Sequence, residues 1–367
     1  MKFKITKKKL LYSLQKVNSL ITKNTLYPIL ENILIEVKDN VLFLTSTNLE
    51  LEIQTKTSKI FSCIPGNITV SGKKILAICR KLPNNSDITI LLKQNKLKIF
   101  SENSFYSLAT LPAFNFPRFQ TMTHQISFSI LQNIFKVIIF STQFSMAVQD
   151  LRNCFNGLLL EIRNQHLYIV ATDGYRIAIC KTPLKHSCKY YSIIIPRKGV
   201  IELLRLLNDS LTLIFIKMNN NHFQVHINNT VFTSKIIEED FPQYSSIILK
   251  NSNRKIIINT FLFKEALSRI VILSNEAFRG VLIKNNKNQL KMTTSNQHDE
   301  KACELLEVIY INTNIEVSIN AYYMLDILNV LENNEVCLSL NDSHSSIQIQ
   351  YNHQNYKLIY ILMPLKM

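Results

Sequence analysis

Three short segments contain residue types that could support catalysis or phosphate binding. Thr172-Asp-Gly-Tyr-Arg176 places a carboxylate, a glycine and an arginine together, as a metal or phosphate loop would, and Val70-Ser-Gly-Lys-Lys74 contains part of a phosphate-loop pattern. The second segment lacks the G-x-x-x-x-G-K-[ST] spacing, and the six glycines of the whole chain leave little for a glycine-rich cradle. His222 and His226 lie in a strand-like stretch without a carboxylate pattern, which favours packing or surface roles. An enzyme is therefore the weaker alternative.

The seven cysteines form no recognisable metal or disulfide pattern. Their number is odd and no C-x-x-C pair occurs, so neither a zinc site nor a disulfide framework is indicated. The first residues are charged without the apolar core of a signal peptide, and no apolar run reaches the about 18 residues of a membrane span. We expect a cytoplasmic protein with no cofactor, no metal and no membrane partner.

The chain is strongly basic, with 42 Lys+Arg against 26 Asp+Glu and a net charge of +16. Such an excess favours polyanionic partners through long-range attraction and counterion release. The chain is also crowded with Lys, Asn and Ile and has no Trp, a composition that an AT-rich coding sequence produces without any selected ligand. The net charge alone does not distinguish selection for a polyanionic partner from a by-product of an AT-rich coding sequence.

The elements that must position these residues recur three times along the chain. Similar alternating segments surround Leu42, Leu167 and Leu290, at a spacing of roughly 125 residues, which is the size of a domain and not of a solenoid unit. A chain of 367 residues with 47% hydrophobic content can bury several cores. The sequence therefore predicts three similar domains, at 1–125, 126–250 and 251–367.

Each period is predicted to hold two related units, each with an amphipathic helix and alternating strands. Apolar residues such as Leu10, Leu14 and Val17 recur at helical spacing. The fold class is α+β, with two helices packed on antiparallel sheets in every domain. The expected helices are 7–20, 131–143 and 262–273 in the first units and 73–81, 198–207 and 321–331 in the second units.

This repetition constrains the assembly. If the helix pair covers one side of the strands, the sheets of neighbouring domains can join at their edges while the helices face a common axis. Three domains cannot close a ring wide enough for duplex DNA, whereas two chains joined head to tail supply six. A closed dimeric ring is therefore expected. The alternative is a non-ring basic scaffold, which would bind linear and circular DNA alike.

Five separated segments resemble the bacterial DNA polymerase III β subunit family, the sliding clamps. They follow the family's order along the whole chain and lie at 143–150, 171–176, 195–202, 272–280 and 363–367. The resemblance implies a DNA clamp fold and a non-catalytic processivity factor of DNA replication, which encircles duplex DNA as a head-to-tail homodimer. The implied partners are double-stranded DNA, the DNA polymerase III catalytic subunit, the clamp-loader complex and other proteins with a clamp-binding motif.

The resemblance also implies a partner-peptide pocket between the second and third domains, where apolar walls with a few polar groups suit a short extended peptide. Tyr175, Phe155, Ser246 and Lys366 replace the usual histidine, leucine, arginine and arginine, which narrows one wall and removes a bidentate donor. The matching positions are Phe155, Thr172, Gly174, Tyr175, Arg176, Ile177, Pro242, Ile247, Asn320, Tyr323, Ser346, Met363, Pro364, Leu365 and Lys366.

The implied contacts with DNA are weak and independent of sequence, because a tight contact would stop sliding. Two places depart from the family. Asn24 stands where arginine is common, although Lys23 can restore the charge, and Asn153 and Cys154 replace an exposed aromatic pair. The implied DNA-contact residues are Lys23, Asn24, Lys73, Gln149, Arg152, Arg197, Lys198 and Arg205.

The implied dimer seam joins the first domain of one protomer to the third domain of its partner. Asn103 and Phe105 stand where basic residues are expected, so the seam should be more hydrophobic and less sensitive to salt than is typical. The matching residues are Lys74, Tyr106 and Leu108 against Ile272, Leu273 and Glu300.

Overall fold

The computed structural model describes most of the 367 residues. The described ranges are 1–23, 26–120, 123–185, 189–249, 252, 254–275, 279–286, 288–311, 315–342 and 345–365. The chain folds into two compact units, unit 1 (Met1–Asn133 and Ile201–Ile236) and unit 2 (Ile134–Val200 and Ile237–Met367). The predicted division at 125 and 250 stays a prediction.

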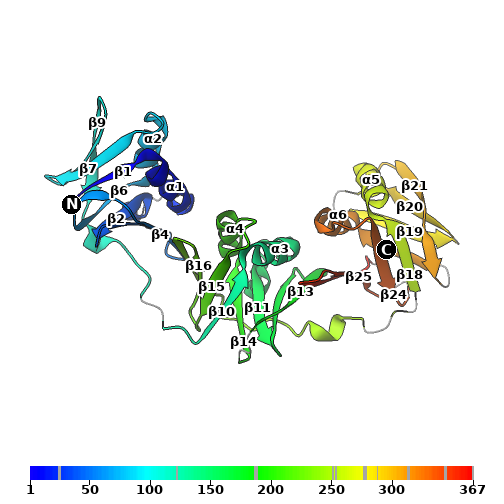
Figure 1. Cartoon of the computed structure of the whole chain (residues 1–367). Coiled ribbons are helices and arrows are strands. Elements are labelled where there is room, and N and C mark those ends of the chain that lie inside the picture. Colours follow the sequence, from blue (N-terminus) through cyan, green and yellow to red (C-terminus); the bar gives the residue numbers. More distant parts are fainter. Residues whose placement is uncertain are drawn as a thin grey trace. The chain divides into compact units, whose positions relative to one another are not determined.

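The described residues contain six α-helices, all close to their predicted positions (Figure 1). Two end three residues earlier than predicted, because the last turn tightens into a 3₁₀ helix: η1 (Asn18–Leu20) follows the first helix and η6 (Val271–Leu273) the fifth. The Asn18 side-chain amide also donates to Leu14 O at 2.9 Å, so this carbonyl accepts both the backbone N–H and the side chain of the residue that caps the helix. The helices are α1 (Lys7–Val17), α2 (Gly72–Lys81), α3 (Gln132–Gln143), α4 (Arg197–Leu206), α5 (Thr260–Ile270) and α6 (Ala321–Val330).

Unit 1 is built on a 13-stranded antiparallel sheet. One pairing in this sheet joins strands from the first and second predicted domains, with Thr230 opposite Thr55 and Phe232 opposite Ile53. In spatial order the strands are β10 (Ile126–Leu131), β15 (Leu213–Met218), β16 (His222–Ile227), β17 (Thr230–Lys235), β4 (Leu51–Thr57), β3 (Val41–Thr47), β2 (Asn32–Lys38), β6 (Gly66–Ser71), β9 (Ser104–Leu111), β8 (Lys96–Ser101), β7 (Asp87–Lys93), β1 (Lys2–Thr6) and β5 (Phe61–Ile64).

Unit 2 contains a nine-stranded and a four-stranded antiparallel sheet. The first is joined in its middle by β13 and β26, where Ile177 lies opposite Ile361. Sheets of neighbouring predicted domains therefore do join at their edges, as expected. The first sheet runs β14 (Tyr191–Pro196), β11 (Gly157–Arg163), β12 (His166–Thr172), β13 (Arg176–Pro183), β26 (Lys357–Leu362), β25 (Ile347–Asn352), β24 (Glu335–Leu340), β18 (Arg254–Asn259) and β22 (Ile309–Ile311), and the second β21 (Lys301–Glu307), β20 (Gln289–Ser295), β19 (Gly280–Asn286) and β23 (Ile315–Asn320).

Among the described elements, one order, a strand, a helix and three strands, recurs six times, with β5 and β22 as additional strands, which confirms the predicted six units. Tight hairpin turns close without glycine. Asp39 and Asn40 between β2 and β3, and Asn164 and Gln165 between β11 and β12, all have positive φ angles. Such two-residue turns match the right-handed twist of the strands, and Asp and Asn tolerate the left-handed region better than other side chains. Asparagine thus does here what glycine does in many hairpins.

The hydrophobic core lies between the helices and the sheets. The apolar stripe of α1, with Leu10, Leu14 and Val17 buried, packs on β4 and α2, and α5 packs on α6 and β21 in the same way. Each fully buried aliphatic side chain stabilises the fold by about 1.5–3 kcal/mol. Within the described residues, no helix combines the length and the apolar character that crossing a membrane requires.

Candidate functional site

A tight turn between β12 and β13 forms the centre of the candidate site. The Thr172 hydroxyl accepts a hydrogen bond from Gly174 N at 3.1 Å and donates to Arg176 O at 2.6 Å. One oxygen of Asp173 accepts from the backbone N–H groups of Tyr175 and Arg176, both at 3.0 Å. Gly174 has a φ angle of 90°, which a residue with a Cβ rarely adopts. The sequence of this turn therefore fixes its shape locally.

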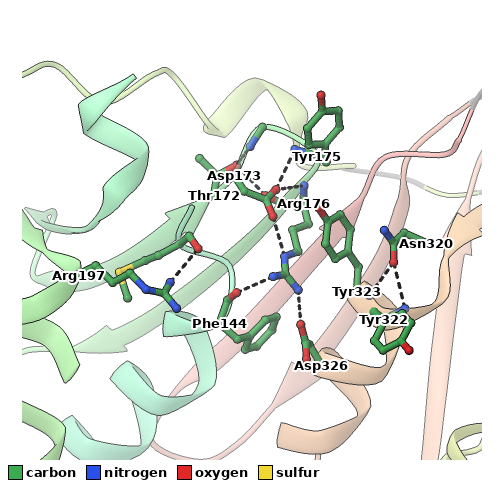
Figure 2. A network of polar contacts seen from close by, with 12 residues as sticks. Phe144, Thr172, Asp173, Tyr175, Arg176, Arg197, Asn320, Tyr322, Tyr323 and Asp326 are labelled. Carbon is green, nitrogen blue, oxygen red and sulfur yellow. Dashed lines mark hydrogen bonds and ion pairs between the residues drawn. The ribbon is translucent and has the colours of Figure 1, made fainter. Parts of the chain in front are cut away.

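The Arg176 guanidinium connects this turn to two helices (Figure 2). Its Nε donates to Asp173 Oδ2 at 3.0 Å, one terminal nitrogen donates to Asp326 Oδ2 at 2.6 Å, and the other donates to Phe144 O at 2.6 Å. Asp326 belongs to α6, and Phe144 directly follows α3. Only 10% of the Arg176 side chain is exposed, so these charge-assisted bonds lie largely out of water.

Two aromatic rings flank the same guanidinium. Its carbon lies 4.2 Å from the ring centre of Tyr323 and 5.3 Å from that of Phe144. Burial raises the pKa of the Tyr323 phenol, and the charge of Asp173 raises it further, so the hydroxyl stays protonated at neutral pH. Tyr323 is held by the start of α6, where the Asn320 side chain accepts from the N–H groups of Tyr322 and Tyr323 (Figure 2).

The end of the chain runs beside this network. Met363 N donates to Tyr175 O at 2.9 Å and Leu365 N donates to Ser318 O at 2.8 Å. These two bonds attach the tail to the turn at one end and to β23 at the other. Met363 is 41% exposed and Tyr175 65% exposed, so both side chains present apolar surface to the solvent. Pro364 between the two bonded residues has no N–H to satisfy.

An apolar cluster is formed in part by β13, which follows the turn, and by β26, which precedes the tail. Its buried members include Leu159, Ile177 and Ile361, and the half-buried Ile247 and Phe241 pack against it. Tyr244, which is also buried, donates its hydroxyl to Glu161, so the cluster contains a satisfied polar pair. A site with this floor and the polar turn above it can accept apolar side chains while offering hydrogen bonds to a backbone.

Most of the predicted peptide-site residues come together here. The turn, Tyr323, Asn320 and the tail are linked by the bonds given above. Phe155 is buried with its ring 6.4 Å from that of Phe241, and Ser346 directly precedes Ile347, which pairs with Leu362 next to the tail. Pro242 is exposed and adjoins Phe241 in the chain. Lys366 lies outside the described residues.

Sequence reasoning missed the residues that hold the site together. Asp173 was inside a recognised motif, but its bonds to Arg176 follow only from the turn. Asp326 lies 150 positions from Arg176, and Phe144 contributes a backbone oxygen, so neither left a local signal. The one available signal is that Asp326 is the single acidic residue in the predicted helix 321–331.

Arg152, predicted to contact DNA, lies at the rim of the same site. It binds Asp150 in a bidentate pair with both nitrogen–oxygen distances at 2.9 Å, and its guanidinium lies 4.2 Å from the ring centre of Phe155. Those hydrogen bonds lower the pKa of the Asp150 carboxyl to about 2. Nearby, Asn153 and the Cys154 N–H both donate to Glu239, so the two positions that lack the family's aromatic pair are fixed by one carboxylate.

The other predicted DNA-contact residues occur in both units. In unit 1, Lys23 and Lys73 are exposed, and Arg205 forms an ion pair with Glu202 at 3.3 Å. In unit 2, Gln149 and Lys198 are exposed, and Arg197 donates to Met146 O at 3.0 Å. Asn24 lies outside the described residues.

Of the predicted seam residues, Tyr106 and Leu108 lie on β9, Lys74 lies on α2, Ile272 and Leu273 lie on η6, and Glu300 directly precedes β21. Along 104–109 β9 pairs only with β8, and among the described strands β21 pairs only with β20. Lys74 is exposed, and Tyr106 and Leu108 are half-buried on β9. Ile272 is 76% exposed, Leu273 is half-buried, and Glu300 is bound to Asn296 at the turn before β21.

The two histidines considered for chemistry have packing roles. The His222 ring meets the Phe119 ring edge-on at 4.9 Å, and His226 bonds Gln224 at 2.8 Å. Burial lowers the pKa of both imidazoles. In the part of the chain that the structure describes, no group of three or more His, Cys, Asp or Glu side chains is arranged for a metal ion.

Comparison with known proteins gives matches over the whole chain. The N-terminal, central and C-terminal domain profiles of the DNA polymerase III beta subunit match residues 1–120, 129–243 and 245–366. The beta sliding clamps of Buchnera aphidicola subsp. Rhopalosiphum padi and Escherichia coli strain K12 are 43% and 38% identical, with 100% of each chain covered. A crystal structure of the DNA polymerase III subunit beta from Pseudomonas aeruginosa has a TM-score of 0.96 at 34% identity, again over 100% of both chains.

Proposed function

The chain belongs to the DNA polymerase III beta subunit family, the sliding clamps of bacterial DNA replication, and we propose that its partners bind at the Arg176 turn through a short extended peptide. A sliding clamp performs no catalysis. It encircles duplex DNA as a dimeric ring and tethers the polymerase. The observation that carries this function is the match of all three clamp domains, in order, to this chain.

The proposed peptide site is the apolar cluster together with the turn and the tail. An apolar side chain of the peptide enters beside Ile177 and Ile247, where the cluster offers apolar surface. The exposed Tyr175 and Met363 side chains then cover it from either side. The three hydrogen bonds of Arg176 keep the turn, the end of α3 and α6 in place before the peptide arrives, which lowers the ordering cost of binding.

A matched pair of tyrosines tests this site. Tyr175 and Tyr190 are both 65% exposed in unit 2, but only Tyr175 belongs to the proposed site. Tyr175→Ala should weaken binding of the purified DNA polymerase III catalytic subunit at least tenfold, whereas Tyr190→Ala should leave it within twofold. Griselimycin, which is bound in solved structures of the clamps from P. aeruginosa and Bartonella birtlesii, serves as a small second probe. Equal effects of the two variants would show that the peptide binds at a different site.

We place the dimer seam between the β9 edge of one protomer and the β21 edge of its partner. Among the described strands, neither edge has a further neighbour for its backbone N–H and C=O groups, so antiparallel pairing between the two edges would satisfy both. Ile272, exposed in the single chain, would then be covered. Sedimentation or light scattering should give a species of twice the 42.5 kDa chain mass. A monomer at every accessible concentration would exclude the ring and favour the non-ring scaffold.

The DNA contacts are proposed to come from basic side chains such as Lys23, Lys73, Arg197, Lys198 and Arg205. A lysine acts as a mobile point charge and reads no base, which is what sliding requires. The clamp-loader complex, other proteins with a clamp-binding motif, and a cytoplasmic location follow as parts of the same proposal. Retention on circular DNA with release from linear ends, after loading by that complex, distinguishes a ring from the scaffold.

A further inference from the structure

A small pocket in unit 1 lies outside the peptide site and the seam. It has a volume of about 260 Å³ and is formed by α1, the end of β4 and the turn that leads into β17. Its lining includes five serine or threonine side chains and three lysines, and none of the described lining residues is a carboxylate. The peptide site, in contrast, contains the carboxylates of Asp173 and Asp326, so the two sites are expected to bind different ligands.

The hydroxyl groups share one face of the sheet. Thr55 and Thr57 are two positions apart on β4 and therefore project to the same side. Thr230 lies directly opposite Thr55 on β17, and opposed residues also share a face. From the helix above, the Ser13 hydroxyl lies 2.9 Å from the Thr57 hydroxyl.

Two of these contacts leave a proton available to a ligand. Thr230 Oγ1 accepts from Lys16 Nζ at 3.0 Å, so its own hydroxyl proton can be donated elsewhere. In the pair of Ser13 and Thr57, one hydroxyl donates to the other, and the proton of the acceptor is likewise left over. The pocket is therefore richer in donors than in acceptors.

Thr55 is a buried hydroxyl residue of this set that lacks a hydrogen-bond partner. Its hydroxyl oxygen is buried, with the residue only 2% exposed, and it makes no hydrogen bond to any described residue. The strand is paired on both sides, with β3 and β17, so the side chain cannot move far to find a partner. A buried hydroxyl without a partner is unfavourable, and nearly all such groups in proteins are satisfied.

Cationic groups surround the same pocket. Lys9 and Lys59 line it, with Lys56 beside them. Lys16 adds a fourth ammonium group, held 4.5 Å from the ring centre of the lining residue Tyr12. A ligand that fits must be small, anionic and able to accept several hydrogen bonds, since the volume is below the roughly 300–1,000 Å³ of pockets for larger molecules.

We propose that this pocket binds a phosphate group. Phosphate oxygens only accept hydrogen bonds, carry the opposite charge to the lysines and are numerous enough to use the free protons of Thr55 and Thr230. The phosphate belongs either to a nucleic-acid backbone or to a small phosphorylated molecule, because both present the same oxygens. The proposal goes beyond the peptide site and does not require the ring.

The primary test uses inorganic phosphate with the full-length protein. Titration at constant ionic strength, with chloride as the reference anion, should show saturable binding. Lys9→Gln combined with Lys59→Gln should raise the phosphate Kd at least tenfold. The matched control is Lys93→Gln with Lys96→Gln, which removes the same charge from the exposed turn between β7 and β8 and should leave the Kd within twofold. Binding no better than chloride, or an equal loss in the control, would overturn the proposal.

Thr55→Val gives an independent readout. Valine has the shape of threonine without the hydroxyl, so without phosphate the variant should melt at or above the wild-type temperature. With saturating phosphate the wild type should gain more, because it alone makes that hydrogen bond. A variant that is less stable than wild type without phosphate would mean that the Thr55 hydroxyl is already satisfied, which would count against the site.

A third measurement assigns the source of the phosphate. For linear duplex DNA, the slope of log affinity against log salt concentration falls by about 0.9 for each phosphate contact that is lost. If the backbone is the source, the Lys9 and Lys59 double variant should show that decrease relative to its control. Equal slopes, together with the loss of inorganic phosphate binding, would assign the pocket to a small phosphorylated molecule.

Discussion

The Arg176→Met variant removes the hydrogen bonds of the guanidinium and keeps the packing of the aliphatic part of the side chain. Methionine keeps an unbranched chain between the rings of Tyr323 and Phe144 but removes all three hydrogen bonds to Asp173, Asp326 and Phe144 O. The turn itself should survive, because Asp173 still accepts from two backbone N–H groups. What the variant should lose is the attachment of the turn to α3 and α6.

The magnitude follows from the exposure of each partner. Hydrogen bonds to charged groups are worth about 1.5–3 kcal/mol when buried. The Asp326 side chain is 43% exposed and regains water, so its bond counts for about 0–1 kcal/mol. Asp173, 13% exposed, loses a largely buried partner, and breaking such a pair costs about 3–5 kcal/mol. Since Asp173 keeps its backbone donors, we expect about 3 kcal/mol.

Native-state hydrogen exchange measures this locally. The Met363 N–H, bonded to Tyr175 O, should lose roughly a hundredfold in protection, because every 1.4 kcal/mol is a factor of ten. Polymerase affinity should fall with it. The control is Arg205→Met, whose side chain is 63% exposed and, among the described residues, pairs with Glu202; it should change the protection of the Met363 N–H by less than about fivefold. Unchanged protection at Met363 in Arg176→Met would refute the reasoning.

Four further outcomes are expected. Deleting 363–367 removes the tail bonded to Tyr175 and should abolish polymerase and clamp-loader binding without changing the dimer mass; retained affinity would place the site elsewhere. Replacing Ile272 and Leu273 by alanine should yield monomers, at roughly 2–5 kcal/mol per side chain that the seam buries, and an unchanged dimer mass at nanomolar protein would argue against this interface. Clamps loaded on nicked circles should survive salt that strips the protein from linear DNA, and should leave when the circles are linearised; earlier loss would mean that charge, not closure, retains them. Burial raises the pKa of Glu52, so its contribution to stability is present below its unfolded pKa and is lost as the pH rises through the folded value. Glu52→Gln should therefore melt no lower than wild type at pH 7 and depend less on pH, and a lower melting temperature there would contradict this.

Local patterns in the sequence determined the elements and their order. The helical spacing of Leu10, Leu14 and Val17 predicted α1, and the repeated alternating segments predicted the hairpins β2–β3, β11–β12 and β19–β20. Both patterns arise because burial on one face of a helix or strand imposes a period on neighbouring residues. Helix ends were less predictable. The last turns of 7–20 and 262–273 became 3₁₀ helices, a choice that depends on which carbonyls find partners.

Tertiary structure decided which distant residues meet. Nothing near Arg176 in the chain announces Asp326, and nothing near Thr55 announces Thr230, because strand pairing and helix docking bring them together from far apart. A residue's type is local, whereas its partner depends on every element that closes around it.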